Sequence, residues 1–419
     1  MKLSELKNTK VDTDLFVHVF AFISVLLIGA DIWGVNVGVN LRLDQIFLLV
    51  LSFLLLLKNG FALSKNKFVA AFCAFALISA IGAVSPVRGV IFYCSIIYNV
   101  FFVYLCFYNY VLIYGTEKFV SILRKTCYVQ FLIILLQFAL KVLFKYELPF
   151  LPGYGEYMGV YRFCIWFYEP SYLATYMTFW LTLSLSKLLL KKDYSYVKDC
   201  VLCLLVMLIS TSSSGFAGIA FSFILVYVLW LFGGISLKKL SVIFVAAVGV
   251  MCVKIFLPNL FDAFISRIFS GDLNGATGGR VEGWTETLEV FKKNVLFGVG
   301  PGCYGIYLGK GTSYVPTNVT LELMATLGIF AAVAFYAFTV WLVVKSFKIY
   351  GNRRDDAGFT LFALALSLIV FTVILQVNQG YLRLYHWMFF GVIAGGIKRY
   401  GGGYVGGYSP ELPLRKYGA

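Results

Sequence analysis

Histidine is nearly absent from this chain of 419 residues, which holds only His18 and His386, far apart in the sequence. Nine cysteines are present, but their spacing fits no metal site, and the Cys200–Cys203 CxxC pair has no further ligands beside it. A zinc or similar site needs several such ligands close together. We therefore expect a protein that works without a metal and without a cofactor.

Charged side chains are also scarce, at 13% of the residues, whereas hydrophobic residues make up 60% and the mean hydropathy is +0.86. This is more apolar surface than a globular core could bury, and the apolar runs are long enough to cross a bilayer. The composition predicts an all-α polytopic membrane protein. No chain of acidic residues runs through the apolar segments, which argues against a proton-coupled transporter.

The basic excess, +15 in formal charge, gathers at the ends of the apolar runs. We attribute it to the positive-inside rule rather than to a nucleic-acid partner. With both termini in the cytoplasm, most of the 35 lysines and arginines fall on the inner side. About twelve transmembrane helices are expected, at 15–33, 41–57, 68–84, 90–113, 126–144, 170–190, 199–213, 215–233, 240–258, 319–344, 358–376 and 384–397.

This pattern divides the chain into 1–258 with the first nine helices, a large outer loop at 259–318, the last three helices within 319–398, and a tail at 399–419. The tail is rich in glycine and tyrosine, and we expect it to be cytoplasmic and disordered. Two further segments face outward: the 145–169 loop and the short 378–386 stretch.

The 145–169 loop ends in a run of aromatic residues around Arg162, Tyr168 and Glu169. A carboxylate in such apolar surroundings is partly desolvated, which raises its pKa and suits it to act as a general base. Alternatively, Arg162 and Glu169 form an ion pair that anchors the loop at the headgroups, and the aromatic residues form a membrane-interface belt.

The large outer loop contains an amphipathic helix that begins at Arg280, after Thr277-Gly278-Gly279. Its apolar residues recur at helical spacing and are Val281, Trp284, Leu288 and Phe291. Free N–H groups at a helix N-terminus favour an anion, and the guanidinium fork of Arg280 matches a phosphate. Arg267 could reach the same anion. The alternative is that Arg280 pairs with Glu282 or Glu286 on its own helix.

Two other segments on the expected outer side are considered as parts of a functional site. The glycine-rich run from Gly298 to Gly305 follows a helix and contains Pro301, so it does not fit a nucleotide loop, and we interpret it as a tight packing turn. At the outer start of the last span, His386 is a candidate catalytic base and Arg383 a candidate phosphate ligand.

The order of these motifs along the chain resembles the O-antigen polymerase and ligase superfamily, the Wzy-like proteins. The resemblance covers most of the chain and includes the large outer loop between the ninth and tenth spans. Its motifs are Arg42-Leu43-Asp44, Arg162 followed by Phe167-Tyr168-Glu169-Pro170-Ser171-Tyr172-Leu173-Ala174, Ser210-Thr211-Ser212-Ser213-Ser214-Gly215, Arg280 with Trp284, Gly298 to Gly305, and Asn318 with Leu321-Glu322-Leu323 and Leu327-Gly328.

The resemblance implies a glycosyltransferase C-like membrane architecture and a metal-independent glycosyltransferase in the bacterial inner membrane, with its active site facing the periplasm. It would transfer a glycan from an undecaprenyl-diphosphate-linked oligosaccharide, within membrane lipid, to a sugar hydroxyl. A chain-length regulator protein is a further partner. The implied diphosphate ligands are Arg162, Arg267, Arg280 and Arg383, the base is Glu169 or His386, and the residues that position the sugar or the loop are Tyr168, Trp284 and Asn318.

Two departures favour the polymerase over the ligase branch. Ligases of this superfamily carry a histidine just before the position of Asn318, where this chain has Thr317, and the Glu169-Pro170-Ser171 motif is more similar to the polymerases. The family's arginine in the junction of the seventh and eighth spans is replaced by Ser213 and Ser214. A flippase for lipid-linked oligosaccharides and a structural member of a polysaccharide assembly complex remain as alternatives.

Overall fold

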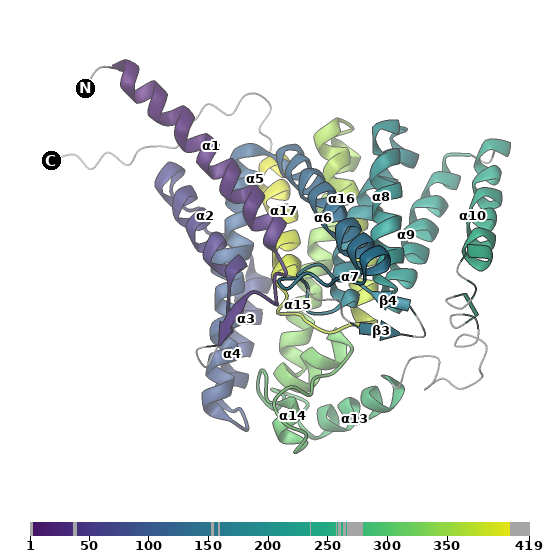
Figure 1. The fold of residues 1–419 in the computed structure, drawn as a ribbon. Coiled ribbons are helices and arrows are strands. Elements are labelled where there is room, and N and C mark those ends of the chain that lie inside the picture. Colours follow the sequence, from purple (N-terminus) through teal and green to yellow (C-terminus); the bar gives the residue numbers. More distant parts are fainter. Residues whose placement is uncertain are drawn as a thin grey trace.

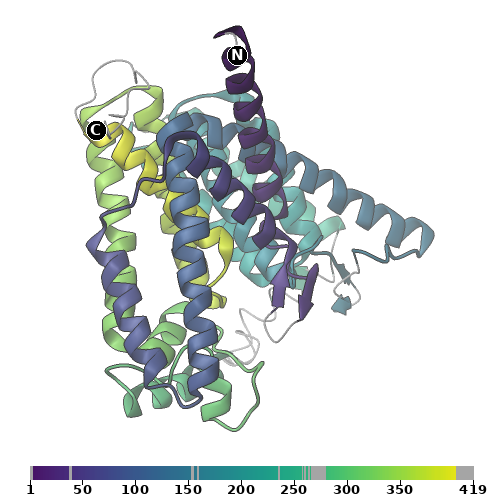
Figure 2. The same cartoon turned by 90° about the vertical axis from the view of Figure 1, so that its left-hand side faces the viewer.

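The structure is a computed structural model that describes residues 3–36, 40–151, 155–157, 160–234, 236–256, 258, 261–262, 265 and 280–402. Most helices run roughly side by side in one bundle, and α13 lies across one end of it (Figure 1). The view from the side shows that the C-terminal part of α6 projects beyond the neighbouring helices (Figure 2).

Helices dominate the described part of the chain, and apolar runs of bilayer length explain why. Pro86 and Pro170 begin two of them, since proline suits the first helical turn. The helices are α1 (Leu3–Leu27), α2 (Leu43–Asn59), α3 (Lys67–Ile81), α4 (Pro86–Tyr98), η1 (Asn99–Tyr104), α5 (Leu105–Tyr114), α6 (Thr116–Phe144), α7 (Pro170–Leu185), η2 (Ser186–Leu190), η3 (Tyr194–Tyr196), α8 (Val197–Ser210), α9 (Ser213–Phe232), α10 (Leu237–Phe256), α13 (Arg280–Lys293), α14 (Tyr304–Tyr307), α15 (Val319–Asn352), α16 (Asp356–Ile374), η4 (Leu375–Val377) and α17 (Leu384–Gly401).

The predicted all-α membrane architecture is confirmed at the level of helical segments, because each of the twelve predicted ranges overlaps one. Six segments of the described chain are long and apolar enough to cross a membrane. That all twelve do so stays a prediction. The two runs separated only by Ser214 are distinct helices, because Thr211 adopts a left-handed conformation at the end of α8 and the chain turns before α9.

The first predicted span, 15–33, runs past the end of its helix, whose apolar part is Thr13–Leu27. The helix starts at Leu3, in the polar N-terminal segment, and it ends at Leu27. Gly29 then adopts a φ of +86°, and a Cβ at this position would lie 2.5 Å from the Phe167 ring. The chain therefore leaves the helix where only glycine fits, and it then enters a hairpin.

Two hairpins that the sequence pattern did not predict follow this turn and the 145–151 segment. The strands β1 (Gly34–Asn36) and β2 (Asn40–Arg42) pair antiparallel, with Gly34 opposite Arg42. The strands β3 (Gly155–Tyr157) and β4 (Val160–Arg162) also pair antiparallel, with Gly155 opposite Arg162. Each strand is only three residues long, too short for an alternating hydrophobic pattern to show.

The core of the bundle is formed by α7 and α17. Every residue of α7 is buried, and so are the residues of α17 from Leu384 to Ile397. Phe179 of α7 stacks on Phe389 of α17 with ring centroids 3.5 Å apart. A helix buried on all sides has no polar face, which explains why both sequences are apolar without helical periodicity.

The glycine-rich run after α13 is a packing turn, as expected, and it is inserted into a break in α15. Gly328 has a φ of +83° and interrupts the helix there. The carbonyls of Ala325 and Thr326, left without helical partners, accept the N–H groups of Val299 and Gly300 at 2.9 Å. The Ser79 hydroxyl of α3 also donates to Thr326 O. Three segments are thus joined at one point by hydrogen bonds to the carbonyls of Ala325 and Thr326.

Candidate active site

Four helices begin in one region of the molecule, and their N-cap residues are polar: Arg42 for α2, Glu169 for α7, Asn318 for α15 and Arg383 for α17. The side chains described below connect these helix starts to one another. Unpaired N–H groups and the positive end of the helix dipole make such a place favourable for an anion. This region is therefore the candidate active site.

Arg383 lies at the centre of the site. Its guanidinium carbon is 3.6 Å from the centroid of the Tyr172 ring, in the first turn of α7. The same guanidinium forms an ion pair with Asp31 in the turn after α1. Burial alone would lower the pKa of Arg383, but Asp31, Tyr172 and Tyr385 outweigh it and hold the pKa above its usual value. The residue is therefore a permanent cation.

Asp31 connects Arg383 to a second arginine. One carboxylate oxygen of Asp31 pairs with Arg42 and the other with Arg383. Arg42 also contacts the buried Asp44 at 3.2 Å, and Asp44 accepts the N–H of Gly29 at 3.1 Å. Buried carboxylates need such partners, because an unpaired buried charge is strongly unfavourable. The two arginines are thereby fixed close together.

The 378–383 segment that carries Arg383 is held by hydrogen bonds to side chains of two helices, α15 and α7. Glu322, one turn into α15, accepts the N–H of Gly380 at 3.1 Å. The Asn378 amide donates to Thr175 Oγ1 of α7 at 2.9 Å, and Gln379 bonds the hydroxyl of Tyr172. Gly380 itself has a φ of +111°. The backbone before α17 is thus rigidly placed, which orients Arg383.

Asn318 is predicted to position sugar or loop, and the structure gives it two contacts. Its Oδ1 accepts the N–H of Leu321 and so caps α15, and its Nδ2 donates to the carbonyl of Gln376 in η4 at 2.8 Å. An asparagine cap of this kind typically contributes about 1 kcal/mol to helix stability. Asn318 joins the end of the large outer loop to the segment that precedes Arg383.

Glu169 and Tyr168 lie beside the arginines, on the chain that enters α7. The Glu169 carboxylate is half-buried and accepts the Ser171 hydroxyl at 2.9 Å. The N–H of Tyr168 approaches Asp31 Oδ2 at 3.4 Å, and its side chain is 59% exposed. An exposed aromatic ring next to a half-buried carboxylate is a reasonable surface for a sugar and its hydroxyl.

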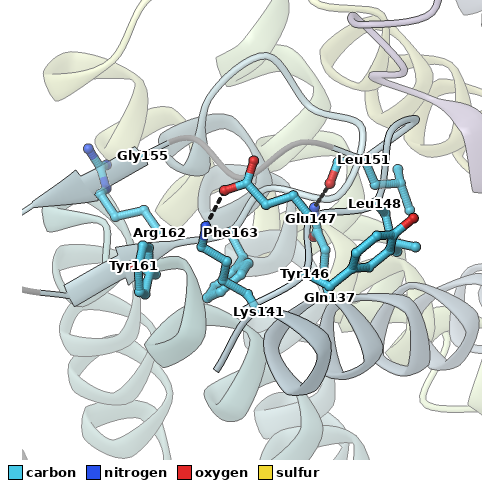
Figure 3. A pocket seen from close by; sticks show the side chains of 10 residues that line it. All are labelled: Gln137, Lys141, Tyr146, Glu147, Leu148, Leu151, Gly155, Tyr161, Arg162 and Phe163. Atoms are coloured by element: carbon cyan, nitrogen blue, oxygen red, sulfur yellow. Dashed lines mark hydrogen bonds and ion pairs between the residues drawn. The ribbon is translucent and has the colours of Figure 1, made fainter. Parts of the chain in front are cut away.

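Arg162 ends β4 and belongs to the wall of a small cavity of about 40 Å³. Figure 3 shows that its guanidinium points away from Glu147, whose carboxylate pairs with Lys141 instead. The Gln137 amide in the same wall donates to Leu151 O at 2.7 Å. The cavity is too small for a sugar, so Arg162 would act from its edge.

The Cys164 thiol, two residues after Arg162, is subject to the charges of Arg162, Glu169 and Asp31. Burial raises the pKa of this thiol to about 12. Arg162 lowers the pKa, whereas Glu169 and Asp31 raise it, so all three charges act on the same atom. Cys164 is itself a free cysteine. The structure thus brings together Arg162, Glu169 and, through Asp31, Arg383.

Arg280 begins α13, as predicted, and lines a groove of about 710 Å³ in the outer loop. The other charged residues of this groove include Lys310 and Glu286, which pair with each other. Thr317 lies at its edge, directly before Asn318. The groove therefore leads along the chain to the start of α15 and is large enough for an oligosaccharide segment.

Trp284 is on the same helix, and its ring is partly exposed. Its indole Nε1 is buried and has no hydrogen-bond partner among the described residues. Arg267 and the Thr277-Gly278-Gly279 helix entry lie outside the described residues.

His386 is enclosed by aromatic rings in the first turn of α17. It is 1% exposed, and the ring centroids of Phe335, Phe371 and Phe390 lie 5.3, 5.1 and 4.6 Å from its own. Within the described chain, neither ring nitrogen has a hydrogen-bond partner. A base needs access to the proton it removes, so this geometry favours Glu169 over His386.

The described residues contain no group of three histidines, cysteines, aspartates or glutamates that could hold a metal ion. Sequence reasoning gave no role to Asp31 or Tyr172, which the structure places against Arg383. Asp31 could have been singled out from the sequence, because acidic residues are scarce and this one directly follows a long apolar run. An aspartate in such a place needs a cationic partner nearby.

Comparison with known proteins gives one family match. Residues 200–336 match the model of a family described as O-antigen ligase. The matched range runs from α8 into α15 and includes Arg280, Trp284, Asn318 and Glu322, whereas Glu169 and Arg383 lie outside it. No curated protein matches the chain.

Proposed function

We propose that this chain polymerises undecaprenyl-diphosphate-linked oligosaccharide repeat units. The match of residues 200–336 to the family described as O-antigen ligase supports a membrane glycosyltransferase of that superfamily. The growing glycan moves from its lipid diphosphate donor to a sugar hydroxyl of a new lipid-linked unit, on the periplasmic side of the inner membrane. The product is O-antigen, capsule or a related surface polysaccharide.

The observation that carries the proposal is the pair Arg42 and Arg383, joined by Asp31 at the starts of α2, α7 and α17. A diphosphate leaving group develops negative charge as its bond to the sugar breaks. Arginines and helix N-termini fixed in advance stabilise that charge without reorganising, which is the largest contribution in many enzymes. Arg162, Arg267 and Arg280 add further cations from the loops.

The proposed reaction needs no metal. Glu169 accepts the proton of the acceptor hydroxyl, whose oxygen attacks the anomeric carbon of the donor glycan. A new C–O bond forms, the bond from that carbon to the diphosphate oxygen breaks, and undecaprenyl diphosphate leaves. Tyr168 and Trp284 would stack against sugar rings, and the apolar surface of the bundle would hold the prenyl tail.

Thr317, at the edge of the outer groove, supports the polymerase over the ligase. It occupies the position at which ligases of the superfamily carry their candidate histidine base. The ligase is the second candidate, because the matching family is described by that name. A flippase would instead place its cations in a central cavity, whereas the arginines here lie at helix starts.

The test compares surface glycan from a strain that lacks the gene with the same strain complemented by the wild-type gene or by variants. We expect the deletion to leave lipid A-core with a single repeat unit and no ladder. Long lipid-linked polymer with an uncapped core would identify a ligase. Repeat units that accumulate on the cytoplasmic side would identify a flippase.

Arginine variants test the diphosphate site itself. We expect Arg383→Ala, Arg280→Ala and Arg162→Ala to abolish the ladder at unchanged protein level. Arg354→Ala is the matched control, since this exposed arginine lies beyond the far end of α15, beside Tyr350. A full ladder from all three site variants would refute the diphosphate role of these residues.

A further inference from the structure

A second large cleft, of about 690 Å³, lies at the other end of the bundle from α13. It is lined by the 63–66 loop before α3 and by the C-terminal parts of α15 and α17. Thr317 borders the outer groove just before α15, and Asn352 at the end of α15 borders this cleft. The 34 residues of α15, interrupted at Gly328, lie between them, so the cleft and the groove are at opposite ends of this helix.

All charged residues that line this cleft are lysines: Lys65, Lys345, Lys348 and Lys398. They come from three separate elements of the fold. Within the described chain, none of the four forms an ion pair, and no carboxylate lines the cleft. Four like charges around one cavity repel one another unless an anion is present.

Four other cations at the same ends of the helices have acidic partners. Arg124 of α6 forms an ion pair with Asp199 at 2.5 Å. Further pairs are Lys58 with Asp14, Lys191 with Asp356 and Arg353 with Asp355. The cleft differs from these four places in that lysines from three elements surround one cavity and no acidic residue lines it.

The loop that carries Lys65 is held in place by side chains of the bundle. Asn109 of α5 receives the N–H of Ala62 at 2.9 Å and donates to the carbonyl of Ala62 at 3.1 Å. The hydroxyls of Ser64 and Tyr104 are 2.7 Å apart, and Asn66 caps α3. A site whose backbone is fixed before binding loses less entropy when a ligand arrives.

The rest of the lining is suited to an amphiphile. Trp341 and Tyr108 have the rings that membrane interfaces favour, and the nearby Leu63 is 65% exposed. Ile349 and Ile397 extend the apolar wall. A ligand with an anionic head and an apolar tail would satisfy both parts of the cleft.

We propose that this cleft binds the phosphate headgroup of an anionic phospholipid, with the phosphate among the four lysines and an acyl chain along Leu63 and Trp341. Basic pockets between membrane helices bind such headgroups, and each lysine near a phosphate contributes favourably. The proposal rests on the membrane-embedded helices and not on the transfer reaction, so the two can fail separately.

The test uses the full chain, purified in detergent and then exposed to phosphatidylglycerol or phosphatidylcholine, with bound lipid counted by native mass spectrometry. We expect retention of phosphatidylglycerol over phosphatidylcholine. Lys345→Gln combined with Lys348→Gln should weaken retention by about tenfold or more. Lys118→Gln combined with Lys125→Gln is the matched control, because these exposed lysines lie on α6 near its start and outside the cleft.

Three outcomes would overturn the proposal: equal retention of both lipids, an equal loss from the control pair, or thermal stabilisation by glycerol 3-phosphate as large as by the lipid. The last would indicate a site for soluble phosphates. If the α15 variant does not fold, Lys65→Gln combined with Lys398→Gln tests the same cleft from its other two walls.

Discussion

Arg383 makes two different kinds of contact at once, since it stacks on Tyr172 and shares Asp31 with Arg42. Counted with Asp44, this cluster of two arginines and two aspartates has no net charge. A diphosphate that contacts Arg42 and Arg383 therefore needs further cations from outside the cluster to balance its charge. The proposed reaction therefore also uses the loop arginines Arg162, Arg267 and Arg280. In this reaction Asp31 positions the guanidiniums of Arg42 and Arg383.

The single residue with the clearest expected phenotype is Glu169. Glu169→Gln keeps the size of the side chain and can still accept the Ser171 hydroxyl, but it cannot take a proton. We expect glycan transfer to fall by about 10²- to 10⁴-fold while donor binding persists. The measurement is a transfer assay with a synthetic lipid-linked repeat unit.

The control for this variant is Glu147→Gln, which changes a carboxylate of the same loop that pairs with Lys141. It should leave the rate within about twofold of wild type, since a surface pair contributes little. Comparable losses from both substitutions would point to loop folding rather than proton transfer.

Sequence reasoning identified Arg383, Arg162 and Glu169 separately but could not connect them. The Asp31–Arg383 pair joins residues 352 positions apart, and nothing local in either segment indicates the other. The burial of His386 was likewise invisible, because a histidine at the predicted start of a span is compatible with both an exposed and an enclosed position. The sequence therefore indicated which residues are candidates for the site, whereas the contacts between these residues follow only from the fold.

At the scale of elements, apolar runs located the helices because bilayer-length segments have few alternatives. The break in α15 was not predicted, since Gly328 lies in an unbroken apolar run, where a single glycine is usually tolerated. The hairpins were missed for a related reason, as three-residue strands are below the length at which a pattern can be recognised.

The break in α15 gives a prediction for stability. At Gly328 φ is +83°, and a Cβ would lie 2.1 Å from the carbonyl oxygen of Leu296. Gly328→Ala should lower the free energy of unfolding by about 3 kcal/mol, through backbone strain and a steric clash. Gly351→Ala, near the end of the same helix, meets nothing within 4 Å and should be neutral or slightly stabilising. Denaturant titration of both purified variants decides between these outcomes.

The outer groove should respond to acid. Burial tends to raise the pKa of Glu286, but hydrogen bonds from Lys310 and Tyr314 outweigh it, so the pKa lies below the ordinary 4.5. A carboxylate with a depressed folded-state pKa stabilises the fold above its unfolded-state pKa, and this contribution disappears as the pH falls through the folded-state value.

We therefore expect the contact between α13 and the 308–314 segment to hold from neutral pH to about pH 5 and to weaken below about pH 4. Hydrogen exchange of that segment, corrected for the intrinsic effect of pH on exchange, measures this. Glu286→Gln should show weaker protection at neutral pH and little further change on acidification. A pH response that survives in this variant would assign the effect to another group.

For the whole molecule, α7 and α17 form the core, and both begin at the candidate active site. The most buried part of the bundle thus supports the residues that need fixed positions, while the loops contribute the other cations. The predicted orientation places this end in the periplasm and the lysine cleft at the cytoplasmic surface, as expected from the positive-inside rule.

Cysteine labelling tests that orientation. In a background with the exposed Cys94 and Cys252 changed to serine, Lys310→Cys should react with a membrane-impermeant maleimide in intact spheroplasts. Lys345→Cys should react only after permeabilisation. The reverse pattern would place both termini outside and would require the active-site assignment to be inverted.

The joint between the glycine-rich turn and the break in α15 also sets how α13 can move. The turn fixes the C-terminal end of α13 through the backbone bonds of Val299 and Gly300. The helix is 14 residues, so Arg280 lies about 20 Å from that fixed end. If α13 tilted by about 5° about the glycine-rich turn, Arg280 would shift by about 2 Å. A shift of that size is roughly the difference between a direct contact of Arg280 with a phosphate and no contact.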